Sequence, residues 1–250
     1  MMTATANLIR CAWPAPPDDL ALERDETHVW LVPLPEWWAQ ANGLTEILSV
    51  EERQRILQFK FEREQKNFAV SRAFLRIILS RYLHLAPGQL RFEYGPHGKP
   101  RLSQNKSSAE LNFNVSHSGS LALVAVAMDR ELGVDLEEIL PLDEMGAIAE
   151  RYFSAAENAR LAAAPSEAPE LFFHFWTRKE AVLKCDGYGF GDEDRIQKAC
   201  EQFRGVVCEL AIEPGYAAHL ALSRPARLRC WRLRGAPTHP LFPAPTNRIT

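Results

Sequence analysis

Residues 111–137, LNFNVSHSGSLALVAVAMDRELGVDLE, decide the fold because three apolar stretches of strand length follow one another between turn signals. In residues 111–116 apolar and polar side chains alternate, which predicts a half-buried strand. Residues 121–127 are continuously apolar, which is typical of a strand buried on both faces. After the next turn, residues 132–137 are predicted to complete a hairpin with that strand. The sequence therefore predicts an antiparallel sheet in the middle of the chain.

Helical signals lie on both sides of this sheet. Ser49 precedes acidic and then apolar residues, which is the pattern of a helix N-terminus. Residues 63–85 carry apolar side chains at spacings of three, four and seven, so we expect a long helix that ends before Pro87. Residues 147–153 and 170–184 are predicted to be two further helices. The other predicted strands are residues 28–32, 205–212, 217–222 and 228–233.

Two carboxylates share one face of the strand predicted at GVDLE. Because strand side chains alternate between faces, Val134 and Leu136 are expected to enter the core while Asp135 and Glu137 emerge together. Mg²⁺ and Mn²⁺ prefer carboxylate oxygens, and such a pair can hold one of them beside a phosphate. A solvated strand face carries the same spacing. The motif indicates a metal site only in combination with further acids.

The segment FWTRKEAVLK places Trp176, Glu180 and Lys184 four residues apart, on one stripe of a helix. An intrahelical Glu–Lys pair of about 0.3 to 0.5 kcal/mol beside a core tryptophan explains this spacing equally well. If Glu180 instead meets Asp135 and Glu137, three buried acids repel one another strongly unless a divalent cation lies among them. Convergence of the three acids would therefore favour a metal site.

Phosphate-binding side chains are available in two turns. Ser116 and His117, in FNVSHSG, lie at the end of a predicted strand, where a hydroxyl and an imidazole can meet phosphate oxygens. A histidine at a turn can equally be structural or solvated. No GxSxG pattern surrounds Ser116, which argues against a nucleophilic serine. Lys99, in GKP, can pair with a phosphate or remain a solvated loop cation.

Composition excludes several classes of protein. With 250 residues and 46% hydrophobic content, the chain can bury one large core or two smaller ones. A net charge of -3 lacks the basic excess of nucleic-acid binders. The five cysteines have no zinc spacing and are expected to be reduced thiols. No apolar run approaches the roughly 18 residues that span a bilayer, so we expect a cytoplasmic protein without a membrane partner.

In order along the chain, the segments GKP, FNVSHSG, GVDLE, RYFSAAE and FWTRKEAVLKCDGYGF resemble the Sfp-type 4′-phosphopantetheinyl transferase family over about residues 49–190. The pair GVDLE and WTRKEAVLK is the specific part of this resemblance. The resemblance implies an α+β fold of two similar halves, a pseudo-dimer in one chain, each half a small antiparallel sheet packed with a long helix. The expected divisions are a loosely ordered segment 1–27, an N-terminal half 28–118, a C-terminal half with the metal site 119–233, and a proline-rich tail 234–250.

The resemblance also implies an activity. The family transfers the 4′-phosphopantetheine moiety of coenzyme A to a serine of an apo acyl or peptidyl carrier protein and releases 3′,5′-ADP. Asp135, Glu137 and Glu180 are the implied ligands of Mg²⁺, or of Mn²⁺ in its place. Glu180, Lys184 and Asp135 are the implied catalytic residues, with Glu180 as a candidate base. Both halves lie in one chain, so a monomer is expected.

Contacts to coenzyme A follow from the same resemblance. Ser116 and His117 match residues that hold its nucleotide end, Lys184 matches a contact to the transferred phosphate, and Lys99 and Arg55 match further contacts.

Several weaker assignments complete the comparison. Glu157 matches an acid near the metal, and Trp176 matches a packing residue beneath the site. Many relatives carry arginine where this chain has Asn67, and Lys66, Arg72 and Arg76 lie on the same predicted helix as possible compensation. The apolar stretch 139–153 is the expected docking surface for the carrier protein.

Two other functions use the same residue types. A metal-dependent nuclease also needs several acids and a lysine, but it typically places an acid and a lysine on neighbouring positions of one strand, and the net charge gives DNA little attraction. A non-catalytic homologue that binds coenzyme A or carrier protein is the alternative within the family. Retention of the three acids and Lys184 argues against it.

Overall fold

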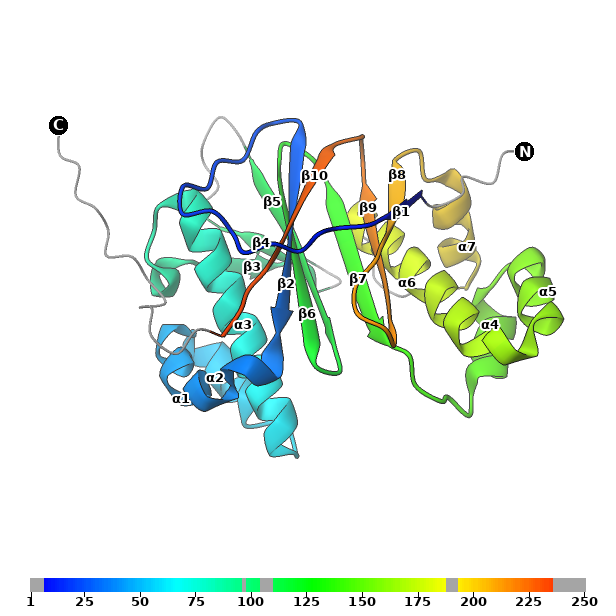
Figure 1. Ribbon diagram of the computed structural model, residues 1–250, viewed down its shortest axis with the longest axis horizontal. Helices are drawn as coiled ribbons and strands as arrows, with labels where there is room; N and C mark the ends of the chain where they lie inside the picture. The colour runs from blue at the N-terminus through cyan, green and yellow to red at the C-terminus, as the bar shows by residue number, and fades with distance from the viewer. Residues whose placement is uncertain (1–6, 96–97, 104–109, 188–192, 236–250) are drawn as a thin grey trace.

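The structure is a computed structural model that describes residues 7–95, 98–103, 110–187 and 193–235, of which residues 7 and 193–195 are described by their backbone alone. Two four-stranded sheets lie back to back in the middle, and a long helix covers the outer face of each (Figure 1). The α+β class predicted from the sequence is confirmed.

The first sheet has the strand order β10-β2-β6-β5. Strands β2, β6 and β5 pair antiparallel, whereas β10 pairs parallel with β2. The long helix α3 packs on this sheet through a large apolar cluster that includes Trp30, Phe74 and Val124. The bounds are Glu26–Pro33 for β2, Glu62–Leu83 for α3, Leu111–Ser118 for β5, Leu121–Met128 for β6 and Arg227–Arg232 for β10.

The second sheet has the order β1-β8-β9-β7 and is covered by α6. Its strands β7, β9 and β8 pair antiparallel, and β1 pairs parallel with β8. Helix α6 ends at Gly187, whose φ of 74° is the left-handed conformation that favours glycine. The bounds are Asn7–Ile9 for β1, Leu132–Glu138 for β7, Ala168–Asp186 for α6, Val206–Leu210 for β8 and Tyr216–Leu222 for β9.

Shorter elements surround these two layers. Ser49 caps α2 and Ser154 caps α5, each in a capping box with a glutamate three residues later. A small third sheet pairs β3 with β4. The bounds are Leu34–Gln40, Thr45–Ile47, Pro87–Gln89 and Pro165–Glu167 for the 3₁₀ turns, Ala41–Leu44 for α1, Val50–Ile56 for α2, Phe92–Tyr94 for β3, Pro100–Leu102 for β4, Met145–Tyr152 for α4, Ala155–Ala163 for α5 and Glu193–Gln202 for α7.

The two halves have the same topology. Each runs strand, long helix, strand, strand, and in each sheet the third strand lies between the first and the second. The outermost strands come from the opposite ends of the chain, since β1 joins the C-terminal sheet and β10 joins the N-terminal one. Because these two strands pair parallel, the sheets are mixed rather than purely antiparallel.

The predicted hairpin between residues 121–127 and 132–137 is wrong. Strand β6 pairs with β5 and β2, whereas β7 pairs with β9 in the other sheet. The chain crosses between the sheets at Arg130, whose buried guanidinium donates to the carbonyl oxygens of Arg24 and Glu26 and to the hydroxyl of Thr27. The predicted boundary between residues 118 and 119 falls in the turn of the β5–β6 hairpin instead of at this crossing.

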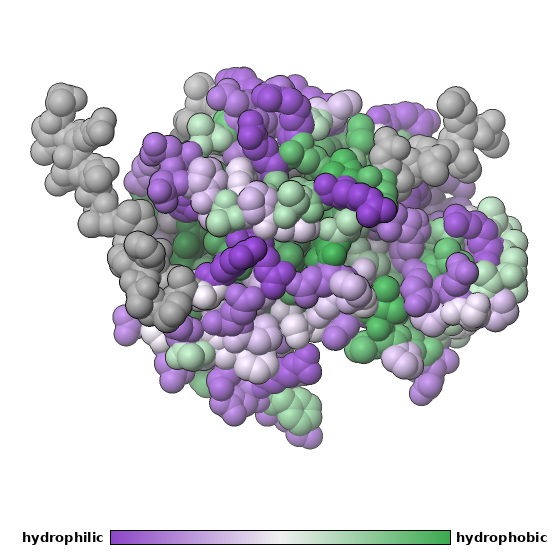
Figure 2. Space-filling view, in the orientation of Figure 1, coloured by the Kyte–Doolittle hydropathy of each residue, from purple (hydrophilic) through white to green (hydrophobic). Residues whose placement is uncertain are grey.

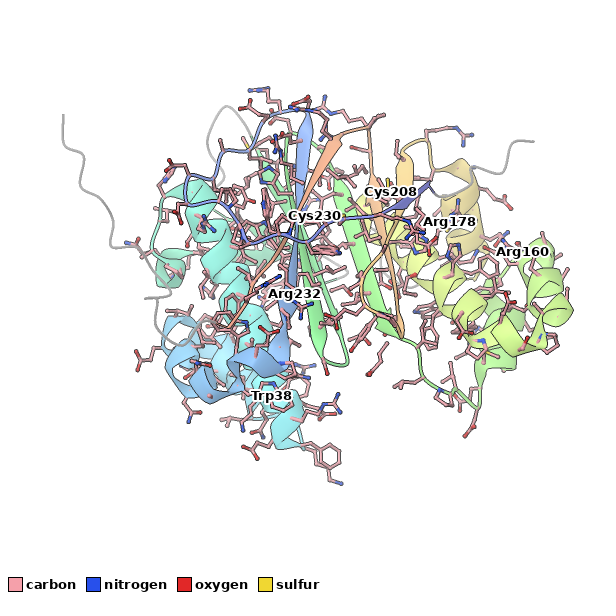
Figure 3. The ribbon with its side chains drawn as sticks, in the orientation of Figure 1. Trp38, Arg160, Arg178, Cys208, Cys230 and Arg232 are labelled. Atoms are coloured by element: carbon pink, nitrogen blue, oxygen red, sulfur yellow. A yellow bond between two sulfur atoms is a disulfide. The ribbon has the colours of Figure 1, made fainter. Side chains whose placement is uncertain are left out.

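The N-terminal segment, predicted as loosely ordered, makes tertiary contacts from residue 7 onward. Strand β1 pairs with β8, and the indole of Trp13 donates to the carbonyl oxygen of Ala211. Cys11 is joined to Cys230 of β10 by a disulfide (Figure 3), so the expectation of reduced thiols is wrong for these two. A separation of 219 residues made this pair invisible to spacing arguments. Residues 1–6 and most of the predicted tail, 236–250, lie outside the described residues.

The two sheets share an apolar layer, in which Val29 and Leu123 of the first sheet meet Val134 and Leu220 of the second. The face of the molecule in Figure 2 is mostly hydrophilic, with smaller hydrophobic areas between. Among the described residues, no helix is both long and apolar enough to cross a membrane.

Candidate active site

Strand β7 sends alternate side chains to opposite faces, as predicted. Val134 and Leu136 are fully buried in the layer between the sheets. Asp135, also buried, lies on the side of α6, where it meets Lys184. The predicted sorting of this strand into a core face and an acidic face is confirmed.

Gly133 lets α6 lie directly on β7. A Cβ atom at this position would lie 2.2 Å from the carbonyl oxygen of Ala181 and 2.4 Å from the amide nitrogen of Cys185, both in the backbone of α6. Only glycine fits such an approach. The helix is therefore close enough for Glu180 and Lys184 to reach the acids of β7.

The polar face of β5 forms a seam against β7. The backbone amide of Val134 donates to the side-chain oxygen of Asn114 at 2.9 Å. Two residues on, the hydroxyl of Ser116 donates to Asp135 Oδ1 at 2.9 Å. After two more, the hydroxyl of Ser118 donates to Glu137 Oε2 at 2.7 Å. Side chains thus replace backbone pairing where the two sheets meet, and the seam fixes both acids.

Lys184 is bound to Asp135. Its Nζ donates to Asp135 Oδ1 at 2.6 Å and lies 3.4 Å from both the hydroxyl of Ser116 and the carbonyl oxygen of Val134. Burial opposes the charge of Lys184, but Asp135 and Glu180 outweigh it and raise the pKa of the ammonium group. The lysine is therefore a fixed positive charge beside the acids.

The carboxyl groups of Glu180 and Glu137 hold their protons more tightly than usual. Burial raises the pKa of Glu180 to about 7, and the charges of Asp135 and Glu137 add to this while Lys184 opposes it. Burial, followed by the charge of Asp135, also raises the pKa of Glu137 against the bond from Ser118. The structure therefore brings the three acids and Lys184 within electrostatic range of one another, with contact between Lys184 and Asp135, but the oxygen atoms of the three carboxylates do not all lie within 4.8 Å of one another.

The oxygen donors of these residues suit a hard divalent cation in their chemistry. Asp135 Oδ2 is buried and has no hydrogen-bond partner among the described residues, which is costly for a carboxylate oxygen. After burial, the charges of Asp135 and Glu137 raise the pKa of Glu180 further, and Lys184 is the cation that opposes them. Oxygen donors from three carboxylates are the ligands that Mg²⁺ and Mn²⁺ prefer. An ion among them would satisfy Oδ2 and remove the repulsion.

The other residues that were predicted to contact coenzyme A do not touch the three acids. His117 follows Ser116 on β5 and keeps solvent contact, and desolvation, then the charges of Lys184 and Arg72, lower its pKa. Lys99 donates to Glu131 Oε2 and to the carbonyl oxygen of Leu132, both at 3.1 Å, at the start of β7.

Arg55 lies elsewhere. It is exposed at the end of α2, where it donates to Gln58 and lies over the ring of Phe59, and none of its described contacts reaches the acids. The structure therefore joins Ser116 to the cluster and brings His117 within electrostatic range of Lys184. It does not bring Arg55 or Lys99 into contact with the acids.

Asn67 has a structural partner on each side. It accepts from the indole of Trp38 and donates to the carbonyl oxygen of Gly119, each at 2.9 Å. Gly119 is the turn residue of the β5–β6 hairpin, and its φ is 55°. Asn67 thereby ties α3 to the turn that follows Ser116, His117 and Ser118.

The arginines proposed as compensation for Asn67 are largely neutralised. Arg72 and Arg76 are buried and both bind the carboxylate of Glu52, at 2.9 Å and 2.8 Å. Arg76 also donates to the carbonyl oxygens of Pro87 and Leu90. The two cations and one acid leave one net positive charge on this side of α3.

Glu157 and Trp176 support the neighbouring helices. Glu157 accepts from Ser154 in a capping box and pairs with Lys179 at 2.9 Å, and none of its described contacts is with the acidic cluster. Burial alone would raise the pKa of Glu157, but the contacts with Lys179 and Ser154 outweigh it, so the pKa is lowered. Trp176 stacks on Phe172, with ring centroids 6.0 Å apart, which agrees with a packing role.

Sequence reasoning missed three contributors to the site. Gly133, Asn114 and Ser118 have no catalytic side chain, so motif reading passed over them. The signal for Asn114 was present in the alternation of residues 111–116, where it was assigned to the polar face, whereas Ser118 was assigned to the turn that follows this strand. The glycine of GVDLE was visible as a strand glycine, which often marks a close backbone approach.

Comparison with known proteins covers both halves of the chain. Residues 30–129 match the family described as 4′-phosphopantetheinyl transferase, N-terminal, and residues 131–237 match the 4′-phosphopantetheinyl transferase superfamily. The two matches meet at Arg130, where the chain crosses between the sheets.

Individual relatives carry the same description. The chain is 37% identical over 193 residues to 4′-phosphopantetheinyl transferase HetI of Nostoc sp., covering 77% of this chain and 81% of that protein. It is 38% identical to 4′-phosphopantetheinyl transferase psf-1 of Bacillus pumilus, covering 60% of this chain and 62% of that protein. It is 28% identical to the human L-aminoadipate-semialdehyde dehydrogenase-phosphopantetheinyl transferase, covering 66% and 55%. With both halves matched and the acids and Lys184 assembled at the junction between them, the chain belongs to the 4′-phosphopantetheinyl transferase superfamily.

Proposed function

We propose that this chain transfers the 4′-phosphopantetheine moiety of coenzyme A to a serine of an apo acyl or peptidyl carrier protein, with Mg²⁺ bound by Asp135, Glu137 and Glu180. The supporting observation is that Lys184 contacts Asp135, that the charges of Asp135 and Glu137 act on Glu180, and that the buried oxygen Asp135 Oδ2 has no hydrogen-bond partner among the described residues. We further propose that the enzyme is a cytoplasmic monomer and that its two halves of equal topology are a pseudo-dimer, with the metal ligands on the C-terminal half.

In the proposed reaction the serine oxygen of the carrier attacks the phosphorus atom next to the pantetheine. A new P–O bond forms, the bond to the bridging oxygen of the pyrophosphate breaks, and 3′,5′-ADP leaves. Mg²⁺, when bound, neutralises charge on the pyrophosphate and on the leaving group. Transfers of this kind depend mainly on positioning and charge stabilisation.

Each residue of the cluster has a role that follows from its contacts. Glu180 has no hydrogen bond to another described residue, so an oxygen of its carboxylate is free to accept the proton of the carrier serine. Lys184 is held as a cation by Asp135 and supplies positive charge to the transferred phosphate. Ser116 and Ser118 orient Asp135 and Glu137 through the seam.

Coenzyme A would lie along the junction between the sheets. His117 follows the seam residue Ser116 and is solvent-accessible beside Lys184 and Arg72, which favours an anionic group such as a phosphate. Lys99, 12% exposed, is engaged by Glu131 and would have to exchange this partner to contact the ligand. Arg55 is retained as a proposed outer contact only.

The decisive experiment measures the intact mass of an apo acyl carrier protein after incubation with the enzyme, coenzyme A and Mg²⁺. We expect a gain of one phosphopantetheine that depends on metal and is lost in Asp135→Ala and Lys184→Ala. Glu213→Gln, which changes an acid between β8 and β9 that pairs with Arg232 of β10, serves as the matched control and should retain transfer. Folded protein that binds coenzyme A but modifies none of several carrier types would instead indicate the non-catalytic alternative.

The proposed carrier surface is the segment that follows β7. Leu140 and Leu142 are 53% and 37% exposed and come directly after the strand of Asp135 and Glu137. Exposed apolar side chains next to a site favour a protein partner. Replacing both by serine should raise the KM for carrier protein about tenfold or more and leave the Kd for coenzyme A unchanged. Leu57→Ser, at an 80% exposed position on the other half, is the control. An unchanged KM in the double variant would exclude this surface.

A further inference from the structure

A second cluster of metal-ligating side chains lies under α6, apart from the acids. His174 on α6, Glu209 on β8 and His219 on β9 each offer one ligand atom, and these atoms lie within 4.8 Å of one another. His174 Nδ1 is 3.5 Å from Glu209 Oε2, and the rings of His174 and His219 meet edge to face with centroids 4.7 Å apart. None of these residues takes part in the proposed transfer.

His219 presents a free nitrogen to this cluster. The hydroxyl of Thr177 is 2.7 Å from the carbonyl oxygen of Phe173, to which it donates, so its oxygen accepts Nδ1–H of His219 at 2.8 Å. The lone pair is then on Nε2, which is fully buried and has no hydrogen-bond partner among the described residues. Metal-binding histidines are commonly oriented in this way, by a hydrogen bond at the other ring nitrogen.

The cluster combines a fixed ligand with two movable ones. The bond from Nδ1–H of His219 to Thr177 leaves the lone pair at Nε2, and this is the form in which a histidine binds a metal ion. The side chains of His174 and Glu209 are 27% and 35% exposed, which leaves a path for an ion. Bond lengths of about 2.0 to 2.2 Å require ligand atoms roughly 3.4 Å apart. His174 Nδ1 and Glu209 Oε2, at 3.5 Å, already meet this spacing, and no pair within the 4.8 Å limit has to close by more than about 1.4 Å.

We propose that His174, Glu209 and His219 form a site for a divalent transition metal ion, Zn²⁺ in the first instance, with one position open to water. Two imidazoles and one carboxylate form a ligand set that binds Zn²⁺ in preference to Mg²⁺. The site shares no ligand with the acidic cluster: Glu180 lies six residues beyond His174, roughly 9 Å along the helix, although the two clusters adjoin where His219 pairs with Asp135.

The site would connect α6 to the sheet beneath it. Its ligands come from α6 and from two neighbouring strands, and His219 lies directly opposite Asp135 in the register of β9 and β7. A bound ion would therefore fix the helix that carries Glu180 and Lys184. Arg178, one turn after His174 and labelled in Figure 3, is a nearby cation that weakens the site electrostatically.

The test uses the full chain, stripped of metal with a chelator and then supplied with excess Mg²⁺ to fill the acidic cluster. Co²⁺ is titrated as a spectroscopic probe, followed by competition with Zn²⁺. We expect one Co²⁺ per chain with the visible absorption of a four- or five-coordinate nitrogen and oxygen site, displaced by Zn²⁺. We also expect Zn²⁺ to raise the Tm, because binding to the folded state stabilises it.

Variants distinguish binding at this site from binding at the acidic cluster or at a surface histidine. His174→Gln and Glu209→Gln should each weaken Co²⁺ binding at least tenfold and abolish the rise in Tm, and Thr177→Val should weaken binding about tenfold by releasing the ring of His219. Arg178→Gln should tighten binding. Glu180→Gln and the exposed His84→Asn are controls that should bind as the wild type does. Absence of the absorption band, its loss in Glu180→Gln, or its persistence in His174→Gln would overturn the proposal.

Discussion

The substitution Gly133→Ala tests whether the close approach of α6 to β7 builds the active site. The added Cβ would lie 2.2 Å from the carbonyl oxygen of Ala181, 2.4 Å from the amide nitrogen of Cys185 and 2.8 Å from the carbonyl carbon of Lys184. Ordinary contact begins at 3.4 Å, and all three atoms belong to the backbone of a helix. The helix must therefore move away from β7 by about 1 Å, because no side chain can rotate to relieve the overlap.

The expected magnitudes follow from this displacement. Overpacking of this kind costs about 2 to 3 kcal/mol in the free energy of unfolding, which lowers the Tm of a chain this long by about 5 to 10 °C. The same movement carries Lys184 and Glu180 away from Asp135, and a misplacement of about 1 Å reduces a rate about 100-fold. Stability is measured by urea denaturation and the rate by the mass of the carrier protein over time.

Gly146→Ala is the matched control, because a Cβ there meets no atom within 4 Å and the residue lies in helix α4. Alanine should leave the stability unchanged or raise it by up to about 1 kcal/mol. If Gly133→Ala unfolds at the same urea concentration as the wild type and transfers phosphopantetheine within threefold of its rate, the close approach does not position the site.

Three further predictions concern the cluster and its supports. In metal-free protein the pKa of Glu180, raised by burial to about 7 from an ordinary 4.5, means that wild-type stability falls as pH rises from 4.5 to 7. Glu180→Gln should therefore be more stable by about 3 kcal/mol at pH 8 and equal at pH 4, and urea titrations showing a constant difference would contradict this. Ser118→Ala removes the hydrogen bond to Glu137 and should slow transfer about tenfold in the mass assay. Ser120→Ala is the control and should transfer at the wild-type rate. If Ser118→Ala also transfers at the wild-type rate, the seam between β5 and β7 has no role in catalysis. Asn67→Ala breaks the hydrogen bonds to Trp38 and Gly119 and should lower the free energy of unfolding, measured with urea, by about 1 to 3 kcal/mol. The exposed Asn42→Ala is the control and should leave it unchanged. If Asn67→Ala is as stable as the wild type, Asn67 does not tie α3 to the β5–β6 turn.

The active-site acids were predictable because the signals were local. Alternation along β7 placed Asp135 and Glu137 on one face, and the four-residue spacing of Glu180 and Lys184 placed them on one helix face; both depend only on the geometry of a strand and a helix. The capping box of Ser49 and the bounds of α3 were predictable for the same reason. The short strand β1, with only three residues, carried too little periodicity to be recognised.

Pairing between distant segments was not predictable. The strand after residue 130 was assigned to a hairpin because adjacent strands commonly pair, but the buried bonds of Arg130 carry the chain into the other sheet. The exchange of β1 and β10 between the halves and the Cys11–Cys230 disulfide join segments from opposite ends of the chain. No local pattern encodes such contacts.

By itself, the sequence determined the α+β class, the two long helices, the acidic face of β7 and the family to which the chain belongs, because periodicity and motif order are properties of neighbouring residues. Only the tertiary structure decided that the polar face of β5 forms a seam with β7, that Gly133 admits α6, and that Arg55 and Lys99 have partners away from the acids. It also decided that His174, Glu209 and His219 meet under α6. Such contacts depend on how the sheets and helices pack, and packing is set by the whole chain at once.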